Sequence, residues 1–178
     1  LDTKFTYIPV QWTNYHLKNE HSINKKELTN LITKNLNIDT DYFTIVQYAG
    51  GPQVDLQNTL IFSQGGIFDI NEKYNNFLPL PLITKEKVQR HDKKKMLLAS
   101  YTGRQTHQIR KKMEKTLSKN KDIKITNLSS MKSEFTNEQF DSYRDLISES
   151  YFSLCPRGYG PTSFRLYESI SLGSVPIY

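Results

Sequence analysis

Between residues 95 and 178, apolar runs of strand length alternate with segments of helical periodicity, and this alternation limits the fold more than any other feature. The predicted order is strand, helix, strand, helix, strand, helix, strand, at residues 95–103, 106–120, 122–127, 136–150, 151–156, 162–172 and 174–178. Thr106 and Thr136 are predicted N-caps, and Gly173 is the predicted stop of the last helix. This order is typical of a doubly wound, Rossmann-like α/β domain.

The first part of the chain also alternates between strand and helix. The pattern predicts strands at residues 5–12, 43–49 and 59–63, with a helix at residues 24–36. Strand, helix and strand in succession indicate a second parallel sheet.

A polar stretch at residues 71–95, which contains prolines and ends in a run of charge, suits a domain junction. We therefore predict a first domain at residues 1–80, a linker at 81–94 and a second domain at 95–178. Residues 174–178 read as a central strand that further chain would cover. Both domains are thus expected to be incomplete, and the chain to be a fragment.

The composition is that of a globular protein with an uneven distribution of charge. Hydrophobic residues make up 37% of the chain, and no apolar run reaches the roughly 18 residues of a membrane-spanning helix. Residues 85–121 carry a net charge of +10, and the remainder carries −4. Such a block can attract nucleic acid, anionic lipid or an acidic polysaccharide, but a solvated lysine-rich helix face is the favoured interpretation. The lone Cys155 excludes an internal disulfide framework.

Two glycine-containing loops follow predicted strands and precede predicted helices. Residues 101–107 contain Gly103 and Arg104, and residues 155–163 contain Arg157. In open α/β sheets, ligands bind outside the carboxyl ends of the strands, and helix N-termini favour anions. The two arginine loops would make a diphosphate cradle. The alternative is a pair of ordinary turns with surface arginines.

The last predicted helix carries Arg165 and Glu168 on one face, three residues apart. They could form an intrahelical ion pair, or Glu168 could accept a hydrogen bond from a ribose or sugar hydroxyl near an anion site. Phe164, Tyr167 and Ile170 are expected on the opposite, buried side.

Other familiar sites are excluded or disfavoured by the sequence. Neither the dinucleotide-binding glycine fingerprint nor the P-loop motif is present. Asp39 and Asp41 are interpreted as part of a turn rather than as metal ligands. His107 is expected to cap or pack, and Cys155 to be a small core residue rather than a nucleophile.

The closing segment, "FSLCPRGYGPTSFRLYESISLGSVPIY", resembles the signature of the exostosin-type glycosyltransferases (family 47). The matching residues are Cys155, Pro156, Gly158, Ser163, Arg165, Leu166, Glu168, Gly173 and Pro176. The segment "LLASYTGRQTHQIRKKM" is similar to the family's opening of its second domain. The resemblance is strong over residues 95–178 and weak before them.

This resemblance implies an inverting glycosyltransferase of the GT-B fold, with two Rossmann-like domains and a nucleotide-sugar donor, expected to be a UDP-sugar, on the second. It implies Arg157 and Arg104 at the diphosphate and Glu168 at the ribose or donor sugar, with Gly158 and Gly160 allowing close approach of the backbone. Gly103, Ser163 and Arg165 complete the expected donor site.

The resemblance further implies a glycan acceptor. Two arginines and a helix N-terminus could stabilise the leaving diphosphate without a metal ion, so we expect no metal and no other cofactor. No RRM, zinc-finger or helix-turn-helix signature is present, so we expect no nucleic-acid partner. The catalytic base is not identified. A membrane anchor outside the chain is possible, and so is a homo- or hetero-dimer. The expected compartment depends on the source: the lumen of the Golgi or endoplasmic reticulum in a eukaryote, or the cytoplasm in a virus or bacterium. The alternatives are a non-catalytic transferase-like scaffold and a binder of acidic polymers through residues 85–121.

Overall fold

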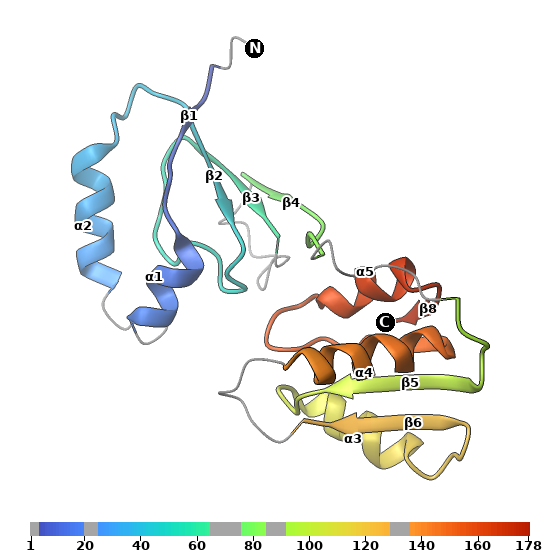
Figure 1. Ribbon diagram of the computed structural model, residues 1–178. Coiled ribbons are helices and arrows are strands. Elements are labelled where there is room, and N and C mark those ends of the chain that lie inside the picture. Colours follow the sequence, from blue (N-terminus) through green and yellow to red (C-terminus); the bar gives the residue numbers. More distant parts are fainter. Residues whose placement is uncertain (1–3, 20–24, 65–75, 85–91, 129–135) are drawn as a thin grey trace. The chain divides into compact units, whose positions relative to one another are not determined.

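The computed structural model describes residues 4–19, 25–64, 76–84, 92–128 and 136–178. The chain divides into two compact units, residues 1–81 and 82–178. Each unit contains a four-stranded sheet in which every described pairing is parallel, with helices packed beside it (Figure 1). The predicted α/β class with two parallel-sheet units is therefore confirmed.

The first unit is built around a sheet of order β1-β2-β3-β4. Its elements are β1 (Thr6–Tyr7), α1 (Trp12–Lys18), α2 (Lys25–Asn35), β2 (Tyr42–Val46), β3 (Thr59–Ser63) and β4 (Phe77–Pro79). Its core joins Trp12 with residues of α2, β2 and β3, including Leu28, Val46 and Ile61. The helix predicted at residues 24–36 and the strand at 59–63 are thus confirmed.

The strand predicted over residues 5–12 is wrong beyond Tyr7. Pro9 has no backbone N–H to continue a ladder, and Trp12 opens α1, which the sequence pattern did not reveal. The Trp12 indole N–H donates to the Thr44 hydroxyl at 2.8 Å, which anchors α1 on β2. Trp12 and His16, one helical turn apart, are both buried, and His16 packs against the ring of Tyr48 at 4.5 Å, which holds this seven-residue helix in place.

The second unit has the sheet order β6-β5-β7-β8. Its elements are β5 (Leu97–Gly103), α3 (Gln108–Leu117), β6 (Ile123–Asn127), α4 (Asn137–Ser148), β7 (Ser150–Leu154), α5 (Phe164–Ser171) and β8 (Val175–Ile177). The predicted alternation of strands and helices is confirmed. Because β5 and β7 are neighbouring parallel strands, the loops after their carboxyl ends emerge at the same edge of the sheet.

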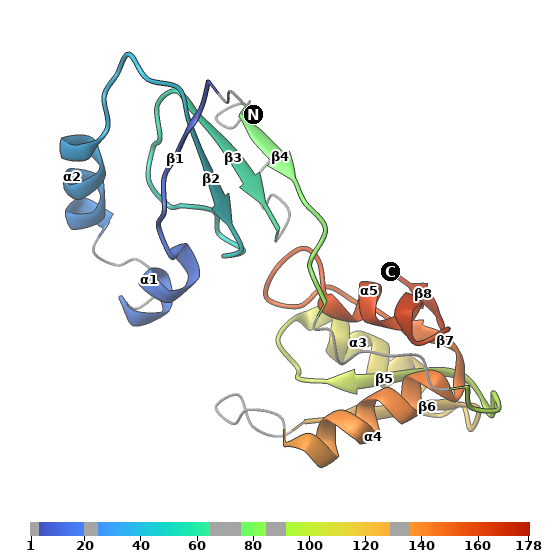
Figure 2. The same cartoon turned by 45° about the horizontal axis from the view of Figure 1, so that its top comes forward.

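Two core clusters lie among the described residues of the second unit. One packs Met113 and Leu117 of α3 against Ala99 and Tyr101 of β5. The other joins Tyr143 and Ile147 of α4 to Leu172 at the end of α5. Side chains alternate between the two faces of a strand, and the neighbouring Ser100 hydroxyl donates to the Leu146 carbonyl of α4. Helix α3 therefore covers one face, and α4 and α5 cover the other (Figure 2).

Two of the three predicted helix-capping residues are confirmed, and the third is wrong. Thr136 forms the capping box of α4 with Gln139, and Gly173 after α5 has the left-handed φ of 73°. The N-cap of α3, however, is His107 and not Thr106. The Nδ1 atom of His107 accepts from the Ile109 backbone N–H at 3.2 Å, which confirms the capping role expected of this histidine.

The buried side of α5 differs from the expectation. Phe164 and Ile170 are 39% and 60% exposed, whereas Arg165, Ser169 and Leu172 are buried. Ser169 is small enough for α5 to approach the end of β7, and its hydroxyl lies 3.7 Å from the Cys155 sulfur. Close packing of small side chains therefore decides which face turns inward, not the apolar spacing. Cys155 is fully buried, as expected.

The acidic pair before β2 is part of a turn, as predicted. The Asn37 carbonyl accepts from the Thr40 N–H at 3.2 Å, and the Asn37 side chain accepts from the Asp39 N–H at 3.0 Å. Within the described ranges, no helix is long and apolar enough to cross a bilayer.

Candidate functional site

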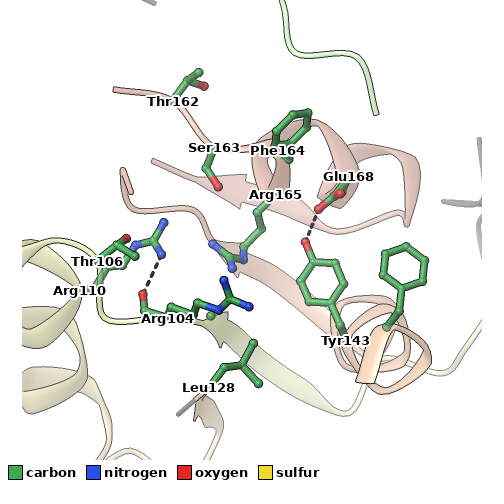
Figure 3. A pocket seen from close by; sticks show the side chains of 12 residues that line it. Arg104, Thr106, Arg110, Leu128, Tyr143, Thr162, Ser163, Phe164, Arg165 and Glu168 are labelled. Carbon is green, nitrogen blue, oxygen red and sulfur yellow. Dashed lines mark hydrogen bonds between the residues drawn. The ribbon is translucent and has the colours of Figure 1, made fainter. Parts of the chain in front are cut away.

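A pocket of about 450 Å³ lies in the second unit, beyond the carboxyl ends of β5 and β7 (Figure 3). Its volume is in the usual range for small-ligand sites, and its position is the usual one for ligands of open α/β sheets. Its lining is formed by Gly103, Arg104, Thr106, Arg110, Leu128, Phe140, Tyr143, Thr162, Ser163, Phe164, Arg165 and Glu168.

The lining contains five of the eight residues predicted for the donor site: Gly103, Arg104, Ser163, Arg165 and Glu168. Arg157, Gly158 and Gly160 are in the adjoining loop but outside the lining. The sequence did not indicate Arg110 or Tyr143 as site residues. Arg110 stands within a run of basic residues that reads as a solvated helix face, and Tyr143 reads as a core position of α4.

Arg165 points from the first turn of α5 into the pocket, with only 8% of its surface exposed. One terminal nitrogen, Nη2, donates to the Thr102 carbonyl at the end of β5. The guanidinium lies over the ring of Tyr101 at 4.5 Å and near that of Tyr143 at 5.9 Å. Its Nε and Nη1 atoms have no hydrogen-bond partner among the described residues. A buried cation with open donors is a site for an anion.

Arg110 connects the two loops that carry the other arginines. From α3 its guanidinium donates to the carbonyls of Arg104 at 2.8 Å, Arg157 at 2.9 Å and Pro156 at 3.3 Å. Burial lowers the pKa of Arg110, but an arginine keeps its charge at neutral pH. One side chain therefore holds the loop after β5 and the loop after β7 in a fixed relation.

Two glycines leave the space that these arginines occupy. A Cβ atom on Gly158 would lie 2.7 Å from Nη2 of Arg110, and one on Gly103 would lie 2.7 Å from Nη2 of Arg165. Distances of this size are closer than non-bonded contact allows. The motif glycines thus make room for the guanidinium groups of the protein itself.

Glu168 accepts a hydrogen bond from the Tyr143 hydroxyl, with 2.5 Å between the two oxygens (Figure 3). Burial raises the pKa of Tyr143 far above its usual range, so its hydroxyl stays protonated and donates. The ion pair considered for Arg165 and Glu168 is not formed among the described residues, because Arg165 turns toward β5 instead.

The side chains at the pocket combine three arginines with one carboxylate. Figure 3 shows the guanidinium groups of Arg104 and Arg165 pointing into the same space, with Glu168 farther along α5. Ser163 is the N-cap residue of α5, but its hydroxyl makes no capping hydrogen bond, and the residue lines the pocket. Such an arrangement can bind an anion at one end and a hydroxyl group at the other.

Comparison with known proteins connects the chain to a family. The family model for the exostosin GT47 domain matches residues 42–178. Human "Ribitol-5-phosphate xylosyltransferase 1" is 40% identical over 42 residues, which are 24% of this chain and 10% of that protein. "Probable glucuronoxylan glucuronosyltransferase IRX7" of Arabidopsis thaliana is 48% identical over 40 residues, 22% of this chain and 9% of that protein.

The matched segments thus span about a tenth of each curated relative, whereas the family model extends over both units of the structure. The printed names of these relatives are those of enzymes that transfer sugars. On the match over residues 42–178, the chain belongs to the exostosin GT47 family of glycosyltransferases.

Proposed function

We propose that the protein transfers a sugar, with inversion, from a UDP-sugar donor to a glycan acceptor, and that the pocket of the second unit binds the donor. The observation that carries this proposal is Arg165, a buried guanidinium with open donors at the carboxyl edge of a parallel sheet. A diphosphate is the part of such a donor that requires fixed positive charge.

Arg104 and Arg165 are the proposed ligands of the diphosphate, because both guanidinium groups point into the pocket. Arg157 stays a prediction for this role. Its side chain lies outside the lining, although its loop is tied to that of Arg104 through Arg110. Glu168 is proposed to accept a hydrogen bond from the ribose or the donor sugar, and Ser163 to contact the donor.

In the proposed reaction, an acceptor hydroxyl attacks the anomeric carbon from the side opposite the diphosphate. The bond from that carbon to the diphosphate oxygen breaks, and the nucleoside diphosphate leaves with the electron pair. A base near the acceptor takes the hydroxyl proton, and the two arginines stabilise the charge that develops on the leaving group. The proposed mechanism assigns this charge stabilisation to guanidinium groups and requires no metal ion.

Calorimetric titration with UDP tests the donor site. We expect the wild-type protein to bind UDP and the Arg165→Met variant to bind at least about tenfold more weakly, because a buried charge–charge contact is lost. Lys112→Met, on the exposed face of α3, is the matched control for loss of one positive charge. Equal affinity of both variants, or no binding by the wild type, would contradict the proposal.

Product analysis tests the chemistry separately. NMR of the product from a transfer assay should show an anomeric configuration opposite to that of the donor. Retention of configuration would refute inversion. Binding of UDP without any transfer would favour the non-catalytic scaffold, since a donor pocket can persist without activity.

A second candidate function is binding of an acidic polymer through the basic block. Lys111, Lys112, Lys115 and Lys119 of α3 and its C-terminal end are exposed, and none forms an ion pair with another described residue. Binding to a heparin-like polysaccharide or to DNA that falls steeply with salt, and that Arg165→Met leaves unchanged, would support this function.

A further inference from the structure

The one acidic side chain among the described residues that line the pocket is held by a residue of another helix. Glu168 belongs to α5, and Tyr143, which donates to its Oε2 atom at 2.5 Å, belongs to α4. The other carboxylate oxygen, Oε1, accepts no hydrogen bond from the described residues. One oxygen is therefore used to fix the carboxylate, and the other is left as an acceptor on a side chain that lines the pocket.

Tyr143 itself has little freedom to move. The residue is 6% exposed and packs with Ile147 and Leu172 in a core cluster. The ring of Phe140 lies 6.2 Å away on one side, and the Arg165 guanidinium lies 5.9 Å from the ring centroid. Because the hydroxyl stays protonated, it donates to Glu168 throughout the neutral range. Tyr143 thus supplies a rigid reference point for a side chain with three rotatable bonds.

We propose that Tyr143 is a positioning residue that orients Glu168 to accept a hydrogen bond from a ribose hydroxyl of the bound nucleotide. This inference rests on the proposed function, and it adds Tyr143 to the site and a preference for ribose over deoxyribose nucleotides. A free glutamate loses rotamer entropy when it binds a hydroxyl, whereas a carboxylate already held by Tyr143 loses little.

The expected consequence is discrimination between ribose and deoxyribose. A site built to bond a hydroxyl rejects a ligand that lacks it, since the polar group is then left without its partner. The wild-type protein should bind UDP about tenfold more tightly than 2′-deoxy-UDP. In Tyr143→Phe, which keeps the ring and removes the hydroxyl, this preference should fall to about twofold.

The test measures both nucleotides by calorimetry with the wild type, Tyr143→Phe, Glu168→Gln and the double variant. Glu168→Gln should reduce the preference as Tyr143→Phe does, and the double variant should be no worse than Glu168→Gln alone, because the two residues act as one unit. Tyr167→Phe is the matched control, because this tyrosine adjoins Glu168 but lies outside the pocket lining. This variant should prefer UDP over 2′-deoxy-UDP as strongly as the wild type does.

The outcomes separate this inference from the function on which it rests. Wild-type binding of UDP with an unchanged preference in Tyr143→Phe overturns the inference and leaves the donor site intact. Equal weakening of both nucleotides in Tyr143→Phe also overturns it, since that is the result of a purely structural role. If the wild type binds neither nucleotide, the proposed function and the inference both fail.

Discussion

Replacing Arg110 with methionine removes three hydrogen bonds that join the loop after β5 to the loop after β7. The guanidinium donates to the carbonyls of Arg104, Pro156 and Arg157, and methionine fills much of the same volume without a donor. The change therefore tests the connection between the loops more than the packing of α3.

The size of the effect follows from these contacts. Each hydrogen bond from a charged donor contributes about 1.5–3 kcal/mol net, and the contact to Pro156, at 3.3 Å, is the weakest of the three. Burying the guanidinium has its own desolvation cost, which the variant avoids. We expect a net loss on the order of 3 kcal/mol in the free energy of unfolding.

The assay is urea unfolding of the variant beside Lys112→Met, an exposed position on the same helix whose change should stay within about 0.5 kcal/mol. Arg110→Lys should fall between them, because an ammonium keeps the charge but lacks the wide planar fork with which the guanidinium reaches three carbonyls. UDP affinity should decline with Arg110→Met, since the Arg104 carbonyl loses one of its three donors and its loop loses the link to the loop after β7. A variant with the stability and UDP affinity of Lys112→Met would refute the argument that Arg110 joins the loops.

Three further predictions follow from single contacts. Gly158→Ala places a methyl group 2.7 Å from Arg110 Nη2 and should cost about 1–3 kcal/mol of stability by urea unfolding, with a smaller cost in the Arg110→Met background; equal costs would contradict it. Thr136→Ala should lose about 0.5–2 kcal/mol because the capping box of α4 is broken, and Thr136→Ser should restore most of it. The pKa of Tyr143 is raised on folding, so its contribution to stability is complete below the unfolded pKa of about 10 and is lost as the pH rises above that value. Tyr143→Phe should therefore lose less stability than the wild type between about pH 8 and pH 11, and an unchanged slope would count against it.

The fold could be predicted where local pattern and tertiary packing agree. The strand at residues 59–63 and the capped start of α4 have this property, since periodicity and capping chemistry act within a few residues. Prediction failed where a contact between residues far apart in the sequence determines the local structure. The strand predicted at residues 5–12 stops before Pro9, and Trp12 begins a helix that its indole bond to Thr44, 32 positions away, anchors on the sheet.

The candidate site shows the same division. Gly103 and Arg104 were predicted from their place after a strand, and Ser163, Arg165 and Glu168 from the last helix and the family resemblance, and all five line the pocket. The predicted Arg157, Gly158 and Gly160 lie outside its lining. The roles of Arg110 and Tyr143 could not, since the partners of Arg110 after β7 stand 46 and 47 residues away, and Glu168 stands 25 residues from Tyr143. The apolar spacing of Phe164 and Ile170 pointed to the wrong face of α5, because small side chains and Arg165 occupy the inner side.

Cys155, the single cysteine, allows local opening of the second unit to be measured by the rate of thiol labelling. Its sulfur is fully buried between β7 and α5, 3.3 Å from the Ser153 carbonyl and 3.7 Å from the Ser169 hydroxyl, and burial raises the pKa of the thiol. A thiol reagent can reach the buried sulfur only when the packing around it opens, so the labelling rate measures how often this local opening occurs. Because Cys155 directly precedes the loop that leads to the pocket, each reacted molecule records one opening of the structure next to that pocket.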